Sequence, residues 1–317
     1  MDVVALGELL IDFTCVSTDG DGYPTMAAHP GGAPANFLAA LAKFGAKAAL
    51  LGKVGGDAFG KMLTATLRKA GIETSGMIET DDVFTTLAFV TLDETGNREF
   101  SFARKPGADT CIAFEELNLR LIDEAKVFHF GTLSLTDEPA RGATYRAVEY
   151  AKNKGKLITY DPNLRKPLWK DLDTCREQML WGLSKADVVK ISDEEVEFLF
   201  GLGVEDGAKH ILENYGVKLV FVTCGADGCF FKNAKAEGKV PSLSDIKVID
   251  TTGAGDIFGG SAVWKLLQID KAPEALEYDE LSAIVSFACT AAGLSTTASG
   301  GISSVPEYET VMKRMGK

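Results

Sequence analysis

The run from Asp250 to Asp256 brings together residue types that could handle a phosphate group. It reads Asp-Thr-Thr-Gly-Ala-Gly-Asp. The apolar residues 246–249 before it predict a short strand, and apolar residues at spacings of three and four between Ile257 and Leu267 predict a helix. The glycines are therefore expected at a helix N-terminus, where backbone N–H groups and the helix dipole bind anions.

Asp256 would lie in the first turn of this helix, where its charge would repel an incoming phosphate. It could be the base that takes a proton from an attacking hydroxyl group while the glycine N–H groups hold the charge on the transferred phosphoryl group. A structural role is the alternative, because an aspartate in a first helical turn is stabilising by itself. The run alone leaves both interpretations open.

Two segments approach better-known nucleotide-binding motifs without matching them. Gly253, Gly255 and Gly259 have the spacing G-x-G-x-x-x-G, one residue longer than the dinucleotide fingerprint. Residues 55–62 approach a P-loop, but Met62 stands where that loop has the hydroxyl group that binds Mg²⁺. We therefore expect neither a dinucleotide-binding half nor a P-loop.

Polar side chains near the N-terminus could contact a ligand. Residues 3–7 predict a buried strand that continues to Asp12, and strand ends are where an open α/β sheet meets small polar ligands. Gly31 and Gly32 then open a helix with Asn36 in its first turns, where the amide offers a donor and an acceptor to a hydroxylated ligand. A solvated aspartate and a capping asparagine are the structural alternatives.

Strand and helix patterns alternate regularly from residue 127 on. Continuous apolar strands in this order predict a parallel sheet covered by helices on both faces. Residues 161–165 follow one strand directly, at the edge where such sheets bind ligands. Ser192 and Glu195 form a capping box, which explains both residues structurally. The predicted strands are 127–130, 157–161, 188–191 and 217–223, with helices at 140–154 and 282–294 and a turn at 225–228.

A different pattern lies between Phe84 and Phe102, where two strands flank the turn 94–97. Adjacent strands without an intervening helix do not belong to a purely doubly wound sheet. We expect a small β lid formed by residues of about 12–30 and 84–104. Arg104 leaves this hairpin where it could reach a cleft, and a solvated arginine is the alternative.

Composition narrows the class of protein. The 317 residues are 46% hydrophobic and 25% charged, which is typical of a globular chain. A net charge of -12 disfavours nucleic acid or an anionic membrane as the main partner. The N-terminus lacks a signal-peptide pattern, and no apolar stretch is long enough to span a membrane. Six scattered cysteines and three histidines predict no zinc site and fit a reduced cytoplasm.

The chain resembles the ribokinase-like (PfkB) sugar kinases over essentially its full length. Two signatures carry the resemblance, one running from Gly31-Gly32-Ala33-Pro34-Ala35-Asn36 to Gly55 and the other being the run from Asp250 to Asp256. Within the family the chain looks most like the fructokinases, through residues 7–12, 102–109, 128–131 and 161–169.

This resemblance implies a fold and an activity. The fold would be a single ribokinase-like domain over 1–317, a three-layer sandwich with a mostly parallel sheet, helices on both faces and the small β lid. The activity would be transfer of the ATP γ-phosphoryl group to the 6-hydroxyl of fructose. Asp256 would be the base, and Gly253, Ala254 and Gly255 would form the anion hole.

The resemblance also implies binding residues, with Mg²⁺ as cofactor and K⁺ as a second cation. The usual N-x-x-E of the family reads Ser192-Asp193-Glu194-Glu195 here, so the asparagine of that motif is missing. The sugar residues would be Asp12, Gly31, Gly32, Asn36, Arg104 and Arg165; the nucleotide residues Asn163, Lys190, Thr223, Gly225, Gly228, Thr252, Gly255 and Cys289; and the metal residues Glu195, Asp250, Thr252, Ser295 and Gly300.

Alternatives remain at this stage. A kinase of the same family acting on 2-keto-3-deoxygluconate would also use Arg104 and Arg165, because both could face a carboxylate. A non-catalytic sugar sensor on the same fold is the alternative from another class. A homodimer through the lid is consistent with its exposed edge strands.

Overall fold

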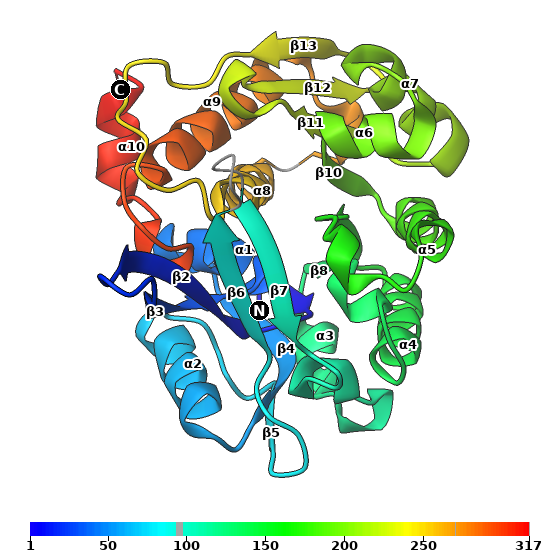
Figure 1. The fold of residues 1–317 in the computed structure, drawn as a ribbon. Helices are drawn as coiled ribbons and strands as arrows, with labels where there is room; N and C mark the ends of the chain where they lie inside the picture. The colour runs from blue at the N-terminus through cyan, green and yellow to red at the C-terminus, as the bar shows by residue number, and fades with distance from the viewer. Residues whose placement is uncertain (93–97, 270, 317) are drawn as a thin grey trace.

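The computed structural model describes residues 1–92, 98–269 and 271–316, which form one large and one small β-sheet flanked by helices (Figure 1). The large sheet has nine strands in the order β13-β12-β11-β10-β9-β8-β1-β4-β5. Its strands are β1 Val3–Leu6, β4 Ala48–Gly55, β5 Met77–Thr80, β8 Val127–Gly131, β9 Leu157–Asp161, β10 Val188–Ser192, β11 Leu219–Thr223, β12 Cys229–Asn233 and β13 Glu237–Val240.

Pairing in the large sheet is parallel from β5 through β11, and β12 and β13 add an antiparallel edge. The parallel part agrees with the continuous apolar strands, which are buried on both faces. All four residues of β1 are buried. Because parallel strands end at one edge of the sheet, the residues that follow β1, β8, β9, β10 and β11 gather there.

Helices cover both faces of this sheet, as the alternation predicts. Val4 and Leu6 face a core cluster shared with α3 to α7, whereas Val3 and Ala5 face a cluster shared with α1, α2, α8, α9 and α10. The helices are α1 Ala33–Lys43, α2 Ala58–Lys69, α3 Leu119–Glu124, α4 Ala140–Asn153, α5 Leu172–Lys185, α6 Asp193–Phe200, α7 Val204–Tyr215, α8 Ala254–Leu267, α9 Tyr278–Ser295 and α10 Tyr308–Arg314. The three-layer sandwich is thus confirmed.

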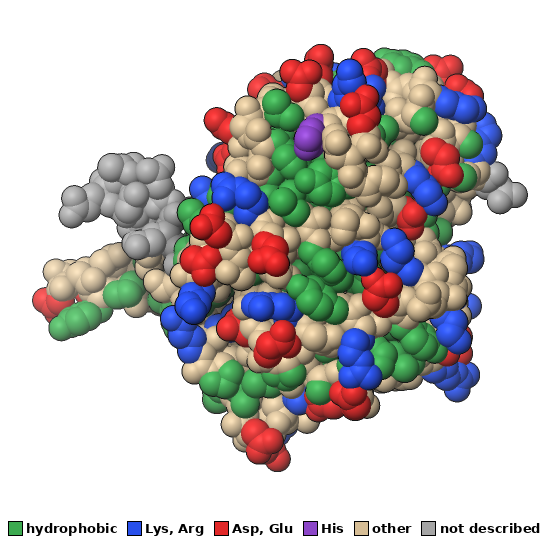
Figure 2. Space-filling view, turned by 90° about the vertical axis from the view of Figure 1, so that its right-hand side faces the viewer, with side chains coloured by type: hydrophobic (Ala, Val, Ile, Leu, Met, Phe, Trp, Pro, Cys, Tyr) green, Lys and Arg blue, Asp and Glu red, His purple; other side chains and the backbone are tan. Residues whose placement is uncertain are grey.

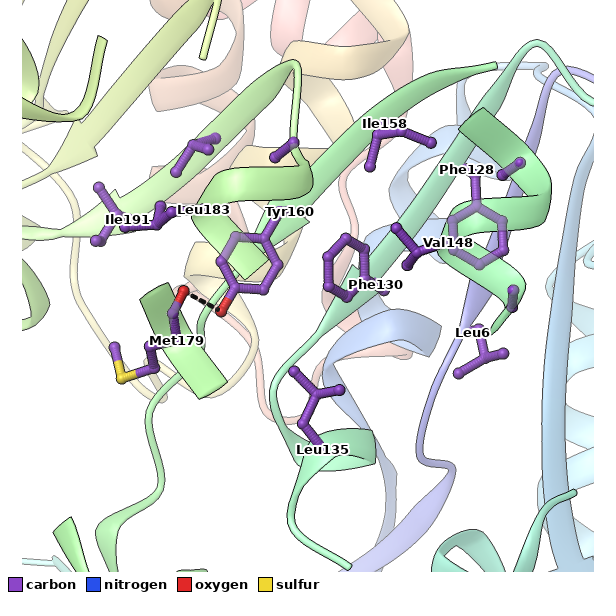
Figure 3. Close-up of a cluster of buried hydrophobic side chains, with 14 of the residues drawn as sticks. Leu6, Phe128, Phe130, Leu135, Val148, Ile158, Tyr160, Met179, Leu183 and Ile191 are labelled. Atoms are coloured by element: carbon purple, nitrogen blue, oxygen red, sulfur yellow. Dashed lines mark hydrogen bonds between the residues drawn. The ribbon is translucent and has the colours of Figure 1, made fainter. Parts of the chain in front are cut away.

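The core beneath α4 and α5 is built on aromatic residues of β8 and β9 (Figure 3). The rings of Phe130 and Tyr160 lie 4.7 Å apart between centroids. The buried Tyr160 hydroxyl donates a hydrogen bond to the carbonyl oxygen of Met179 at 3.3 Å, so its polar atom has a partner. This packing fixes the two strands whose ends carry site residues.

The small sheet has the strand order β3-β2-β6-β7. Strands β2 and β6 pair in parallel, and the other two pairs are antiparallel. Phe13 of β2 stacks on Phe89 of β6 and meets Phe59 of α2 edge-on, which joins this sheet to the sandwich. The predicted hairpin is confirmed, although its turn at 94–97 lies outside the described residues. The strands are β2 Leu10–Thr18, β3 Pro24–Gly31, β6 Leu87–Leu92 and β7 Arg98–Ala103.

Two local predictions are wrong. Residues 246–249 form no strand in the described chain; Val248 and Ile249 are 54% and 60% exposed, and the N–H of Ile249 donates to the carbonyl of Thr296 instead of to a strand. The segment instead meets the C-terminal end of α9, because Thr296 is the C-cap residue of that helix. The first strand also does not continue to Asp12, because the chain leaves the large sheet at Gly7 and β2 belongs to the small one.

The remaining elements are short 3-10 turns, and the surface is of mixed charge. Acidic and basic side chains are interspersed over the face that carries α4 to α7 (Figure 2). None of the described helices combines the length and the apolar character needed to cross a bilayer. The turns are η1 Ala108–Cys111, η2 Phe114–Glu116, η3 Leu133–Leu135, η4 Lys166–Leu168, η5 Gly225–Asp227, η6 Pro273–Ala275 and η7 Ile302–Ser304.

Candidate active site

The N-terminus of α8 is formed by the glycine run, as predicted. Gly253 is the N-cap residue and has a left-handed backbone with φ 76°. A Cβ at this position would lie 2.9 Å from Cα of Gly301, so glycine is required by both conformation and space. The N–H groups of the first helical turn have no intrahelical acceptors, which makes this end suited to an anion.

Asp256 lies in that first turn and meets a residue 220 positions earlier in the chain. Nδ2 of Asn36, on α1, donates to Oδ2 of Asp256 at 2.9 Å. Burial raises the pKa of Asp256, and Glu195 adds to this, while Asn36, Lys190 and Arg165 act in the opposite direction. The structure therefore brings Asn36 and Asp256 together beside the anion-binding turn.

Lys190 and Asp161 form an ion pair next to the same turn. Nζ of Lys190 lies 3.0 Å from Oδ2 of Asp161. Burial raises the pKa of Asp161 to about 7, although the Lys190 charge opposes this. Burial disfavours the charged form of Lys190, but Asp161, Glu195 and Asp256 together raise its pKa. A Cβ on Gly255 would lie 3.1 Å from Nζ, so the ammonium group faces the turn that would hold the phosphoryl group.

A pocket opens between the turn and the ends of β1, β8 and β9. Burial raises the pKa of Glu8 to about 7, with one oxygen accepting the N–H of Ala33 at 2.8 Å. Burial and Lys190 lower the pKa of His129 to about 3, so its ring, stacked on Phe37, is neutral. The lining residues are Glu8, Ala33, Pro34, Phe37, His129, Gly131, Thr132, Leu133, Asp161, Asn163 and Asp256.

Asp12 and the two glycines at the end of β3 lie where the small sheet approaches this pocket. A Cβ on Gly31 would overlap the carboxylate of Asp12, and Gly32 has φ 117°, so both positions need glycine. Burial raises the pKa of Asp12 to about 6; Asp256 and Asp250 add to the rise, and Arg165 opposes it. These electrostatic neighbours place Asp12 and Arg165 near Asp256.

Arg104 is buried and held by other side chains. Its guanidinium donates to Asp109 at 2.8 Å, to Thr136 at 2.8 Å and to the carbonyl of Leu133 at 2.8 Å. Leu133 lines the pocket, so Arg104 lies behind the wall that Leu133 forms. Arg165 donates to the carbonyl of Leu164 and acts on the pKa of Asp12 and Asp256 through its charge.

Three of the predicted nucleotide residues lie at the turn between β11 and β12. Thr223 ends β11, and Gly225 and Gly228 have φ 52° and 93° in the tight turn that follows. A Cβ on Gly228 would overlap the carbonyl oxygen of Val240. Cys289 on α9 is buried, and burial raises the pKa of its thiol to about 12. A second, open pocket beside them is lined by Val240, Pro241, Asp279, Ser282, Ala283, Ser286, Thr290 and Met315.

Glu195 and Asn163 lie near the ion pair. The capping box is confirmed: the N–H of Ser192 donates to Oε2 of Glu195 at 2.8 Å, and the N–H of Leu164 donates to Oε1 at 2.7 Å. Asn163 has a left-handed backbone with φ 47°. In the described part of the chain, no three His, Cys, Asp or Glu residues form a metal cluster. Mg²⁺ commonly needs only one or two carboxylates besides substrate phosphates, so the residues present fit such an ion.

Three of the five residues predicted to bind metal are linked by hydrogen bonds. Oδ1 of Asp250 accepts the N–H and the hydroxyl of Thr252 at 2.9 and 2.7 Å, and Oδ2 accepts the N–H of Gly300 at 3.1 Å. Ser295 ends α9 just before this loop, and its hydroxyl donates to the carbonyl of Ala292.

Sequence reasoning assigned no individual role to three residues of the pocket, Glu8, His129 and Asp161. Asp161 carried a usable signal, because it ends a predicted strand next to the one that carries Lys190. Glu8 and His129 lie in segments that carry the family resemblance, but the burial of their carboxyl group and imidazole is recognised only when their surroundings are known.

The sandwich, the small second sheet and the glycine-rich helix N-terminus define the ribokinase-like class of α/β proteins. The chain belongs to the pfkB family of carbohydrate kinases, whose family model matches residues 1–308.

Individual relatives agree over the whole length. Fructokinase-1 of Zea mays is 41% identical, with 99% of this chain and 98% of that protein aligned. The fructokinase of Xylella fastidiosa with bound ATP is 29% identical with a TM-score of 0.91, covering 100% of this chain and 99% of its own. The fructokinase of Vibrio cholerae with bound fructose, ADP and calcium ion is 29% identical with a TM-score of 0.86, covering 99% and 98%.

Proposed function

We propose that the protein is a fructokinase that transfers the γ-phosphoryl group of ATP to the 6-hydroxyl of fructose. The observation that carries this proposal is the position of Asp256, in the first turn of a glycine-started helix and hydrogen-bonded to Asn36. Relatives named fructokinases at about 40% identity support the choice of sugar.

Asp256 would act as the general base. Its carboxylate takes the proton of the 6-hydroxyl as the sugar oxygen forms a bond to the γ-phosphorus and the bond to the ADP oxygen breaks. The raised pKa makes Asp256 a stronger base than an exposed aspartate. The N–H groups of Gly253, Ala254 and Gly255 hold the charge on the transferred group, and the nearby Lys190 ammonium adds to that stabilisation.

Asp12, Gly31, Gly32 and Asn36 would hold the sugar. The two glycines leave room for hydroxyl groups close to the backbone, and Asn36 is already oriented by Asp256. Arg165 can reach the sugar because it lies near Asp12 and Asp256. Arg104 would act on the sugar indirectly, by holding Leu133 in the wall of the pocket, because its N–H donors are engaged by Asp109, Thr136 and Leu133.

The nucleotide would lie along the turn after β11, with Thr223, Gly225 and Gly228 beside its phosphates and Cys289 near its base. The open pocket next to Val240 and Thr290 adjoins this turn and is the proposed place of the nucleoside. Thr252 and Lys190 would contact phosphate oxygens from the opposite side.

Mg²⁺ would be oriented through water by Asn163 and Glu195, because both oxygens of Glu195 already accept backbone N–H groups. Such an ion supplies neutralisation of the negative charge on the phosphates. K⁺ would be held by the loop of Asp250, Thr252, Ser295 and Gly300, which supplies hard oxygen ligands.

The buried contacts of Arg104 favour fructose over 2-keto-3-deoxygluconate. A substrate with a carboxylate would need to bind both Arg104 and Arg165, but Arg104 is already paired with Asp109 at 2.7 Å. Arg165 would then face the carboxylate alone.

The test is release of ADP from ATP with fructose, ribose, glucose and 2-keto-3-deoxygluconate, comparing wild type with Asp256→Asn. We expect strong turnover on fructose and a fall in kcat of about a hundredfold to ten-thousandfold in the variant. Preference for another sugar would overturn fructose as the substrate. If no sugar supports ADP release but one of them binds tightly, a non-catalytic sugar sensor would be favoured.

At the level of the whole chain, we propose one kinase domain over 1–317 whose lid consists of residues of about 12–30 and 84–104. A homodimer through this lid would cover its edge strands. All six cysteines are free thiols, which supports a reducing, cytoplasmic location.

A further inference from the structure

Asp161, the last residue of β9, lies beside Lys190 in the middle of the neighbouring strand β10. Strands β9 and β10 pair in parallel, with Thr159 opposite Val188 and Tyr160 opposite Val189. Both oxygens of Asp161 contact Nζ of Lys190, at 3.0 and 3.2 Å. The two side chains are only 8% and 12% exposed, so little water competes for the pair.

The ammonium group of this pair lies beside the anion-binding turn that carries the base. A Cβ on Gly255 would be 3.1 Å from Nζ, and Lys190 interacts electrostatically with Asp256. Glu195 is a third carboxylate near the same charge. A buried ammonium keeps a carboxylate partner, because leaving it unpaired is costly. Which of the three carboxylates Lys190 contacts therefore decides where its charge is located.

We propose that Asp161 is a positioning residue for phosphoryl transfer, which holds Lys190 beside Gly255 and away from Asp256. This inference rests on the proposed function. Held there, the ammonium meets the phosphoryl group as it is transferred, and the Asp256 carboxylate stays available for the sugar hydroxyl. Asp161 also accepts the N–H of Asn163 at 3.2 Å, so the same carboxylate orients the turn that carries this residue.

A double-mutant cycle of Asp161→Asn and Lys190→Met tests the inference by steady-state kinetics with fructose and ATP. We expect Asp161→Asn to lower kcat by about tenfold to a hundredfold, with the KM for fructose changed less than about threefold. Because Asp161 acts through Lys190, removing it should matter little once Lys190 is gone. The kcat of the double variant should therefore lie within about twofold of the kcat of Lys190→Met. Asp161→Glu, which keeps the charge, should recover part of kcat.

Asp187→Asn is the matched control. Asp187 also pairs with a lysine, Lys218, at 3.0 Å and accepts a backbone N–H, that of Ile158, at 2.9 Å. It lies at the opposite end of the strands, just before β10. We expect this variant to keep the kcat and both KM values of wild type.

Three results would overturn the inference: multiplicative losses in the cycle, an equal loss of kcat in Asp187→Asn, or a loss confined to the KM for fructose. If Asp161→Asn does not fold, Asp161→Glu takes its place in the cycle. The inference is then overturned if Asp161→Glu keeps the full kcat of wild type and Lys190→Met does not lower kcat. Wild-type turnover on a different sugar would overturn only fructose as the substrate, and the cycle is then run on that sugar. Absence of turnover on every sugar overturns the proposed function and this inference together.

Discussion

Among single residues, Glu8 shows how burial sets the charge of the pocket. Its carboxyl group is almost fully buried, and its pKa is raised to about 7 from a usual value of 4.5. Asp109 adds to the rise, while Arg104 and the N–H of Ala33 oppose it. A carboxyl group whose pKa is higher in the folded than in the unfolded chain stabilises the fold below pH 4.5, and this stability is lost as the pH rises through 7.

Glu8→Gln should therefore remove a pH-dependent loss of stability. Glutamine stays neutral and keeps an oxygen that can accept the N–H of Ala33. We expect the variant to match wild type near pH 4 and to be more stable by about 3 kcal/mol above pH 8. Thermal unfolding from pH 4 to pH 8.5 measures this, with the exposed Glu79→Gln as control. A difference that does not change with pH would contradict the assignment of the burial effect to Glu8.

At the scale of secondary structure, the N-terminus of α8 makes different demands on its two glycines. Gly253 has φ 76°, and a Cβ there would meet Gly301 and Asn36, whereas Gly255 lies within the helix and a Cβ there would meet the end of the Lys190 side chain. Ala in a left-handed conformation costs roughly 1–2 kcal/mol. Within a helix, by contrast, Ala is favoured over Gly.

Gly253→Ala should consequently lower the melting temperature and raise the KM for fructose, because the new methyl group lies 3.1 Å from Nδ2 of Asn36. Gly255→Ala should leave the melting temperature near that of wild type and lower kcat, because it displaces the ammonium of Lys190. Calorimetry and steady-state kinetics on both variants provide the measurements. Equal melting temperatures would show that the α8 turn tolerates a side chain at position 253.

The predictable elements are those whose signal is local. Strands such as Val188–Ser192, the capping box of Ser192 and Glu195, and the helix after Asp256 follow from apolar spacing and helix-start residues. The hydrogen bond between Asn36 and Asp256 has no local signal, because it depends on how α1 packs against α8. The strand predicted at 246–249 is wrong for the opposite reason: the apolar pattern is that of a strand, but the segment bonds to the end of α9 instead of to a strand.

In the whole molecule, the small sheet is joined to the sandwich by an aromatic contact. Phe13 stacks on Phe89 with ring centroids 5.2 Å apart and meets Phe59 of α2 at 5.6 Å. The preceding residue, Asp12, points to the other face of β2, because side chains alternate along a strand. The Phe13 contact therefore fixes the orientation of the sheet that carries Asp12, and a lid so oriented would keep water from the phosphoryl group.

Phe13→Ala tests this lid role by uncoupling ATP hydrolysis from sugar phosphorylation. Each aromatic pair contributes roughly 0.5–1.5 kcal/mol beyond its buried area, so losing two should loosen the small sheet without unfolding the sandwich. We expect a higher KM for fructose and a larger fraction of ATP converted to free phosphate, measured as phosphate released per fructose 6-phosphate formed. Phe200→Ala is the control, since Phe200 contacts His210 and Tyr215 at 4.6 and 5.9 Å on the opposite part of the molecule. If Phe13→Ala and Phe200→Ala give the same ratio, the small sheet does not act as a lid, and its contribution is limited to presenting Asp12 to the sugar.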